Sequence, residues 1–408
     1  MDVIHTHVCG LDVHKKNVVA CMITPDHQEI RTFSTMTEDL LMLVDWIKAH
    51  GVTHVAMEST GSYWKPIYNL LEMEDIKILV VNAKHIKNVP GRKTDVKDAE
   101  WIAGLLHHGL LQGSYIPDRQ QRELRELIRY RRSLIEERAR EINRIQKVLE
   151  GANIKLSSVA TNVLGKSGRA MIEALINGET DPDVLSELAQ RRLKRKKEEL
   201  KKALKGLIGP HQRLMLKTQL EHIDHLDALI EELDAEIKER MRPFEDDLER
   251  LDTIPGVGRR TAEHILAEIG PDMTQFPSAA HLCSWAGVAP GNNESTGKRK
   301  SGKTRKGNQK LRSTLVEAAR AAARSKHTCL SSQYHRIAVR RGANRAAVAV
   351  AHSILTIVYH LLKKKQTYIE LGPHYYEERK RHQVARQAIR KLETLGFKVM
   401  VEPSNQTA

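Results

Sequence analysis

The sequence predicts an α/β domain that is followed by a larger all-α region with long helices. Residues 1–117 alternate short β-branched runs with helical patterns, which is typical of a mixed α/β sheet domain. At Arg119 the pattern changes to a long, charged helix that is nearly free of glycine, in which apolar residues recur every seven positions. With 408 residues, of which 40% are hydrophobic, the chain has enough apolar side chains for more than one core.

The first domain contains strands and helices in a regular order. Two strands, Val8–Val13 and 18–23, are joined by a polar turn, and a third is expected near Ile30. A helix is predicted from Thr37, because acids lie in its first turn and Gly51 follows its end. The remaining predicted elements are a strand at 54–57, a helix at 66–72, a central strand at 78–81 and a helix at 94–107.

Two heptad patterns mark long helices in the next region. Ile128, Ile135, Ile142 and Leu149 are spaced seven apart, and Ile223, Ile230 and Ile237 repeat that spacing within 211–241. The two segments form either an antiparallel arm or a pairing between subunits, of which dimerisation is favoured. Between them, residues 191–205 carry nine Lys and Arg, either as a solvated helix face or as a strip that follows phosphates. The expected domains are 1–117, a coiled-coil linker and dimerisation region at 118–245, a helix-hairpin-helix and serine domain at 246–330, and a basic helical region at 331–408.

The charge and cysteine content narrow the class of protein. The formal net charge is +15, from 66 Lys and Arg against 51 Asp and Glu, which favours a polyanionic partner such as nucleic acid. The four cysteines lie far apart without a CxxC pair, which argues against a disulfide framework or a zinc finger and for a reducing compartment. The most apolar stretch, 346–362, contains two histidines and is predicted to be a buried helix. We therefore expect a cytoplasmic protein without a membrane segment.

Four carboxylates are the first candidate site. Asp12 ends the first predicted strand and Glu58 follows the strand at 54–57, while Asp95 and Asp98 are three apart on one helix face. Crowded carboxylates repel one another unless a hard cation such as Mg²⁺ or Mn²⁺ lies between them. The alternative is that these acids are ordinary caps at strand and helix ends.

A glycine hairpin and a basic loop are candidate nucleic-acid contacts. The PGVG turn at 255–258 offers backbone N–H groups at a helix start, where Gly256 and Gly258 allow close approach and Arg259 and Arg260 follow. Downstream, a loop rich in Gly, Asn and Ser carries cations suited to phosphate. The loop cations predicted to contact nucleic acid are Lys298, Arg299, Lys300, Lys303, Arg305 and Lys306.

A serine in this loop is a candidate nucleophile. Attack of a serine oxygen on phosphorus forms a phosphoserine link that conserves the energy of the broken bond. Ser295 begins the loop, and Ser301 and Ser313 are nearby, so the residues alone leave the choice among them open.

Several motifs in order carry a resemblance to a known family. The segments GLDVHKK, MESTGSYW, KTDVKDAEWIA, TIPGVGRRTAEHILAEIG and WAGVAPGNNESTGKRKSGKTRKGNQKLR resemble insertion-sequence transposases that join a DEDD domain to a serine domain, the bridge-RNA-guided recombinase family. The resemblance covers roughly 8–117 and 250–365. It implies an RNase-H-like first domain with metal-binding acids at Asp12, Glu58, Asp95 and Asp98, and a nucleophile at Ser295.

The same resemblance implies partners and a mechanism. It implies donor and target DNA, a structured guide RNA, and a dimer or tetramer in which the serine domain of one subunit meets the acidic domain of another. Two other functions fit the residues: a structure-selective nuclease in which the acids activate water, and a non-catalytic scaffold that binds RNA or DNA through the basic loop and arms.

Overall fold

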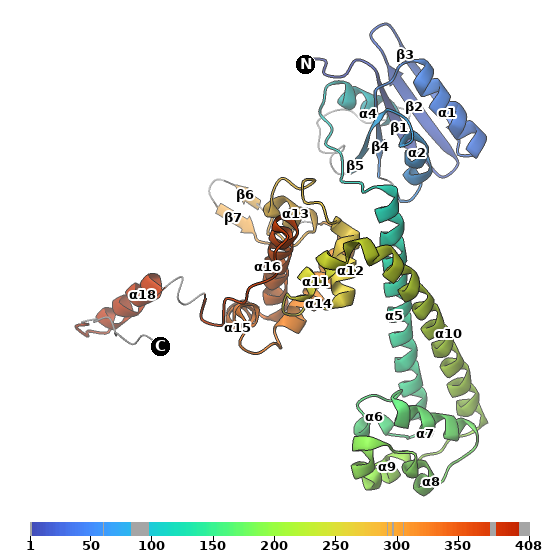
Figure 1. Ribbon diagram of the computed structural model, residues 1–408, viewed down its shortest axis with the longest axis vertical. Coiled ribbons are helices and arrows are strands. Elements are labelled where there is room, and N and C mark those ends of the chain that lie inside the picture. The colour runs from blue at the N-terminus through green and yellow to red at the C-terminus, as the bar shows by residue number, and fades with distance from the viewer. Residues whose placement is uncertain are drawn as a thin grey trace. The chain divides into compact units, whose positions relative to one another are not determined.

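The chain folds into two compact units, Met1–Pro117 and Asp118–Ala408 (Figure 1). The computed structural model describes residues 2–59, 61–82, 98–291, 293–295, 298–304, 306–375 and 381–399. Asp95 and Arg305, both predicted site residues, lie outside these ranges.

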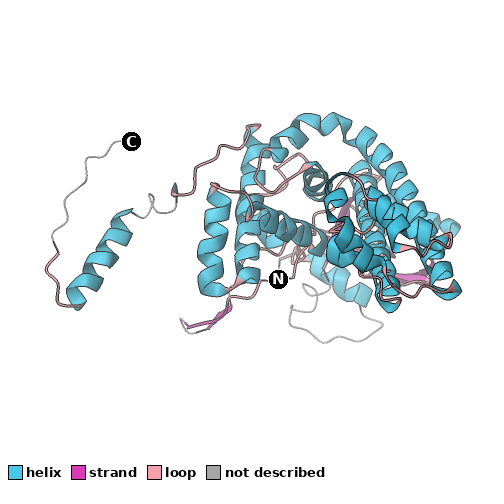
Figure 2. Cartoon of the chain, turned by 90° about the horizontal axis from the view of Figure 1, so that it is seen from below, coloured by secondary structure: helices cyan, strands magenta, loops and turns pink. Residues whose placement is uncertain are grey.

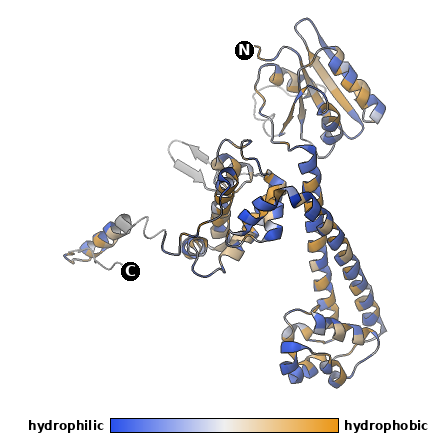
Figure 3. Cartoon of the chain, viewed as in Figure 1, coloured by the Kyte–Doolittle hydropathy of each residue, from blue (hydrophilic) through white to orange (hydrophobic). Residues whose placement is uncertain are grey.

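The first unit is built on a five-stranded mixed sheet of order β3-β2-β1-β4-β5. β1 pairs antiparallel with β2, and β2 pairs antiparallel with β3, whereas β1, β4 and β5 run parallel. The strands are β1 (Val8–Val13), β2 (Asn17–Ile23), β3 (Gln28–Ser34), β4 (His54–Glu58) and β5 (Lys77–Val81). This confirms the predicted α/β domain and is consistent with the RNase-H-like fold that the resemblance implied. Figure 3 shows hydrophobic residues on the strands inside the sheet, whereas the edge strand β3 is mostly polar and exposed.

Helices cover both faces of this sheet. Alternate residues of β1 such as Leu11 pack with α1 (Thr37–Ala49) and α2 (Trp64–Leu71), and the other face packs under α4 (Asp98–His107). Gly10 lies directly beneath α4, because a Cβ there would come within 2.3 Å of a backbone nitrogen of the helix. Only glycine permits this close approach of helix to strand. The predicted helix at 94–107 is described from Asp98 onward.

The second unit begins with two long antiparallel helices. These are α5 (Arg119–Gly151) and α10 (Pro210–Met241), which we call the arm. Leu134 of α5 packs against Leu226 and Ile230 of α10, and Arg240 pairs with Glu123 at 3.1 Å. Of the two uses that the heptads predicted, the structure shows the arm within one chain. The seam residues Ile223, Ile230 and Ile237 are buried there, so they are not exposed to a second subunit.

A small helical cap closes the distal end of the arm. Its apolar core includes Leu149 and Leu216 from the two arm helices. Within 191–205, Lys197 pairs with Glu187 and Lys201 with Asp183, whereas Arg191, Arg192, Lys194 and Arg195 are exposed. The cap elements are α6 (Leu156–Val159), α7 (Lys166–Ile176), α8 (Pro182–Glu187), η2 (Arg191–Lys196) and α9 (Lys197–Leu204).

The rest of the second unit is helical with one small hairpin. Figure 2 shows this hairpin, β6–β7, projecting from the helices of its unit. The elements are η3 (Arg242–Phe244), α11 (Glu245–Asp252), α12 (Arg259–Ile269), α13 (Ala279–Trp285), β6 (Asn293–Ser295), β7 (Lys298–Ser301), α14 (Gln309–Ala322), α15 (Cys329–Arg341), α16 (Ala343–Lys364) and α18 (Arg381–Thr394). α11 and α12 flank the PGVG turn as the sequence predicted.

Helix α16 is the central helix of this part. Among the described residues it alone is long and apolar enough to cross a membrane by length and composition. Of its most apolar window, 56% is buried inside the protein. The prediction of a buried helix at 346–362 is therefore confirmed.

Candidate functional site

Asp12 and Glu58 lie side by side at one edge of the sheet. β1 and β4 are parallel, and their last registered pair is Leu11 with Met57, so Asp12 and Glu58 occupy the next step on adjacent strands. Both residues also lie on the α4 face, since Gly10 and Ala56, two positions earlier on each strand, pack toward that helix. The parallel register therefore brings together two acids that are 46 positions apart.

Asp98 belongs to the same face and the same end of the sheet. Helix α4 runs antiparallel to β1, because the His107 carbonyl at its end accepts from the Ile4 N–H just before the strand. Its first turn lies over Gly10, because a Cβ atom added at Gly10 would lie 2.4 Å from the Ala99 carbonyl oxygen. Asp98 thus begins the helix near the end of β1 that carries Asp12. Three of the four predicted acids share one edge and one face.

A histidine that the sequence interpretation passed over contacts Asp12. His14 Nε2 lies 3.1 Å from Asp12 Oδ2, and the Asp12 side chain is only 17% exposed. The signal was present in the segment GLDVHKK, where His14 opens the β1–β2 turn. A hydrogen bond of this kind orients a carboxylate toward a ligand on its other side.

The described acids do not by themselves complete a metal centre. Within the described ranges no three His, Cys, Asp or Glu side chains are close enough to hold an ion. The fourth predicted ligand, Asp95, lies outside those ranges. Asp12, Glu58 and Asp98 are therefore one part of the predicted ligand set.

Ser295 ends the first strand of a β-hairpin. Residues Ser295 and Lys298 are partners in the register of β6 and β7, so only Thr296 and Gly297 separate the strands. The sequence predicted an open loop here, because no apolar alternation marks either strand. The glycine between the two short polar runs was a sequence signal for a hairpin. Of the predicted cations, Lys298, Arg299 and Lys300 lie on β7, and Lys303 and Lys306 are exposed beyond it.

The base of this hairpin is fixed to the helical core. Pro290 and Thr304 form a bridge, and the Gly291 N–H donates to the Lys303 carbonyl at 3.1 Å. At Gly307 a Cβ would lie 2.5 Å from the Trp285 carbonyl. The segment that follows Ser295 is thus held against the end of α13.

A buried charge network, which we call the junction, lies beneath these elements. Glu268 of α12 is fully buried and accepts from Nε and Nη2 of Arg129 at 2.7 and 2.8 Å and from Nδ2 of Asn308 at 2.6 Å. Burial alone would raise the pKa of Glu268, but His264, Arg129 and Arg125 outweigh it and lower the pKa to about 2. The junction joins α5, α12 and α14, and no local sequence motif predicted it.

The PGVG hairpin has a packing role in the structure. A Cβ at Gly256 would come within 2.4 Å of the Ala318 carbonyl of α14, and its φ is +86°. Arg259 pairs with Glu245 and Glu263, and Arg260 pairs with Asp234. Gly258, by contrast, begins α12 with open space at its Cβ position. Contact of this hairpin with nucleic acid stays a prediction, with Gly258 as its most accessible residue.

Comparisons with known proteins agree with this arrangement. A DEDD transposase model matches residues 9–154, and the model described as transposase IS116/IS110/IS902 family matches residues 248–335. The chain is 26% identical to a transposase for insertion sequence element IS1111A of Coxiella burnetii, over 88% of this chain and 91% of that protein. It is 23% identical to a pilin gene-inverting protein of Moraxella bovis, over 88% of this chain and 96% of that protein.

The fold, the acidic edge and these similarities define an enzyme that acts on DNA, a transposase or recombinase. The chain belongs to the IS110/IS116 family of transposases. A DEDD-type domain in such an enzyme indicates the use of a divalent metal.

Proposed function

We propose that this transposase cuts and rejoins DNA strands through the hydroxyl of Ser295 and a Mg²⁺ or Mn²⁺ site of Asp12, Glu58, Asp95 and Asp98, with a structured noncoding RNA selecting the DNA. The observation that carries the proposal is the convergence of Asp12, Glu58 and the start of α4 on one face of the sheet. The DEDD model spans all four acids, and the IS116/IS110/IS902 model spans Ser295.

The donor set suits a hard cation. Carboxylate oxygens are the ligands that Mg²⁺ prefers, and parallel strands that end in acids place such oxygens together. A bound divalent ion supplies stabilisation of negative charge on the transferring phosphate and the leaving oxygen. His14 holds Asp12 from the side at 3.1 Å, which restricts the orientation of that carboxylate.

The serine step conserves the energy of the phosphodiester bond that is broken. The Ser295 oxygen bonds to phosphorus, a strand P–O bond breaks, and the departing strand oxygen gains a proton while the serine hydroxyl loses one. Attack by a second strand hydroxyl on the phosphoserine reverses the exchange and restores Ser295. Because a phosphodiester is replaced by a phosphodiester, rejoining needs no ATP.

The two groups belong to different compact units, which fits an assembled enzyme. The acids lie in Met1–Pro117 and Ser295 lies in Asp118–Ala408. We propose that the serine of one subunit meets the acids of another in a dimer or tetramer. The charge surplus of +15 favours polyanionic partners, of which the guide RNA is the second that we propose besides DNA.

The test is a search for the covalent intermediate. Purified protein is mixed with RNA transcribed from the DNA beside its gene, labelled donor and target DNA, and Mg²⁺, and adducts are resolved on denaturing gels. We expect an adduct that requires the RNA and the metal, with loss of at least about a thousandfold in Ser295→Ala and in Asp12→Asn.

Matched variants separate the proposal from its alternatives. Ser313→Ala and Asp26→Asn change exposed residues of the same types, and both should retain the adduct. DNA cleavage without any adduct would instead indicate a nuclease in which water attacks. Recombination that persists in Asp12→Asn would show that the acids are not catalytic, and the non-catalytic scaffold would then be the remaining function.

A further inference from the structure

A groove of about 1170 Å³ lies beside the base of the serine hairpin. Pro290 and Thr304, the bridged pair at the hairpin base, form one edge. The other walls come from α14, α15 and α16. Most of this groove is built from residues 331–408, for which the sequence predicted only a basic helical region.

The described lining of the groove is positively charged. Arg312, Arg341 and Arg345 line it together with Lys303, and no Asp or Glu is among the described lining residues. In the part of the chain that the structure describes, none of the three arginines pairs with a carboxylate. Both Arg341 and Arg345 are exposed. Their positive potential is therefore available to a ligand.

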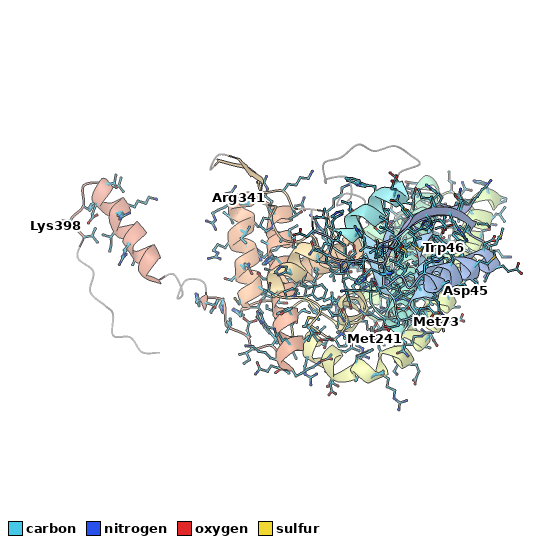
Figure 4. All side chains as sticks on the ribbon, turned by 90° about the horizontal axis from the view of Figure 1, so that it is seen from above. Asp45, Trp46, Met73, Met241, Arg341 and Lys398 are labelled. Carbon is cyan, nitrogen blue, oxygen red and sulfur yellow. The ribbon has the colours of Figure 1, made fainter. Side chains whose placement is uncertain are left out.

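The rest of the lining suits a nucleic-acid backbone. Val288, Ile337 and Val348 contribute apolar surface, while Gln333 and Ser353 form a hydrogen-bonded polar pair at 2.9 Å. Arg345 also lies in the first turn of the long helix α16, whose N-terminal end adds positive potential. Figure 4 labels Arg341, which ends α15.

We propose that this groove binds the phosphates of duplex DNA next to the strand that is cut. Ser295 lies five residues beyond Pro290, so at most about 17 Å separates them even at full extension of the chain. At about 3.4 Å per phosphate along one strand, the groove holds phosphates within about five base pairs of the reacting one. Placing Ser295 at the reacting phosphate rests on the proposed function, but DNA binding by the groove does not.

The experiment measures salt-dependent DNA binding in full-length protein. All variants carry Ser295→Ala, so that no covalent step interferes, and a short labelled duplex of arbitrary sequence is titrated by fluorescence anisotropy over a salt series. Each phosphate contact contributes about 0.9 to the slope of log affinity against log salt. The Arg341→Gln/Arg345→Gln variant should lose about 1.8 of that slope and bind about tenfold to a hundredfold more weakly near 0.1 M salt.

The control removes the same charge from the same two helices. Arg340→Gln/Lys364→Gln changes two exposed cations of α15 and α16 that do not line the groove, and its slope should stay that of the parent. The Arg341→Lys/Arg345→Lys variant keeps the charge and should keep most of the slope. Thermal melting is compared for every variant to verify folding.

Three results would overturn the inference. Equal loss of slope in the groove variant and its control would show an effect of net charge alone. An unchanged DNA affinity with a weakened affinity for a folded RNA would assign the groove to RNA. Unchanged affinity for both would assign it to neither. A missing serine adduct, in contrast, would leave the slopes as measured and would count only against the proposed nucleophile.

Discussion

Two sets of arginines in the second unit have opposite surroundings. At the junction, Arg129 and Arg131 are held by Glu268 and Glu263, and Arg259 is held by Glu245. In the groove, Arg341 and Arg345 have no carboxylate partner among the described residues. Both sets add equally to the net charge of +15, but only the second set is available to neutralise phosphates. Net charge thus favours a polyanionic partner, and the distribution of acids indicates which cations are available to it.

The prediction with the largest expected effect is the removal of Glu268, the central acid of the junction. The Glu268→Gln substitution removes the buried negative charge that pairs with Arg129 and Arg125. The pKa of Glu268 is lowered from 4.5 to about 2, which corresponds to about 3 kcal/mol. We expect the free energy of unfolding to fall by that amount at pH 7, measured by urea denaturation.

The same substitution has a signature in pH. Because the folded pKa of Glu268 is depressed, its stabilisation is full above about pH 4.5 and is lost as pH falls through about 2. The difference between wild type and Glu268→Gln should therefore shrink over that window. Glu317→Gln is the control, because Glu317 is 63% exposed in its pair with Arg132 and should contribute below about 1 kcal/mol. Equal losses in the two variants would contradict a special role for the buried acid.

The glycine hairpin sharpens the contrast with two neighbouring substitutions. Gly256→Ala requires a positive φ and pushes a methyl group into the backbone of α14, so we expect a loss of about 2–4 kcal/mol. Gly258→Ala meets open space and should cost less than about 1 kcal/mol. If the hairpin contacts DNA, Gly258→Ala should also weaken DNA binding while folding is kept. Thermal melting and anisotropy on both variants distinguish packing from contact, and equal melting temperatures would refute the packing role.

Sequence patterns were most informative where periodicity was strong. The five strands of the first unit, the helices around them and the two arm helices were all predicted, because alternation and heptads indicate which face of an element is buried. Strands β6 and β7 were missed, since their polar residues carry no such pattern. The heptads also left open whether the arm forms within one chain or between two chains. That choice depends on whether the intervening cap reverses the direction of the chain, and not on the apolar residues of the heptads.

The candidate site was predictable only in part. Asp12 and Glu58 could be paired in advance because both follow buried strands, whose parallel order then places them together. The role of Arg259 as an ion-pair partner was not predictable from its neighbours, because Glu245 lies 14 positions away across the hairpin. Likewise, Arg312 and Arg341 meet in one groove only through tertiary packing. The local sequence shows which residues are charged, but not which opposite charges they pair with.

The smallest expected effects separate the two arginine sets most directly. Arg259→Gln breaks the partly exposed pairs with Glu245 and Glu263, so we expect about 1 kcal/mol of lost stability and little change in DNA affinity. Arg341→Gln breaks no ion pair with a described residue, so stability should stay within about 0.5 kcal/mol while DNA affinity falls severalfold. Urea denaturation and anisotropy on the same two preparations give both quantities. The opposite outcome, weakened DNA binding in Arg259→Gln with unchanged stability, would mean that Arg259 leaves its carboxylates when DNA binds, and the contrast between the two sets would then hold only for the free protein.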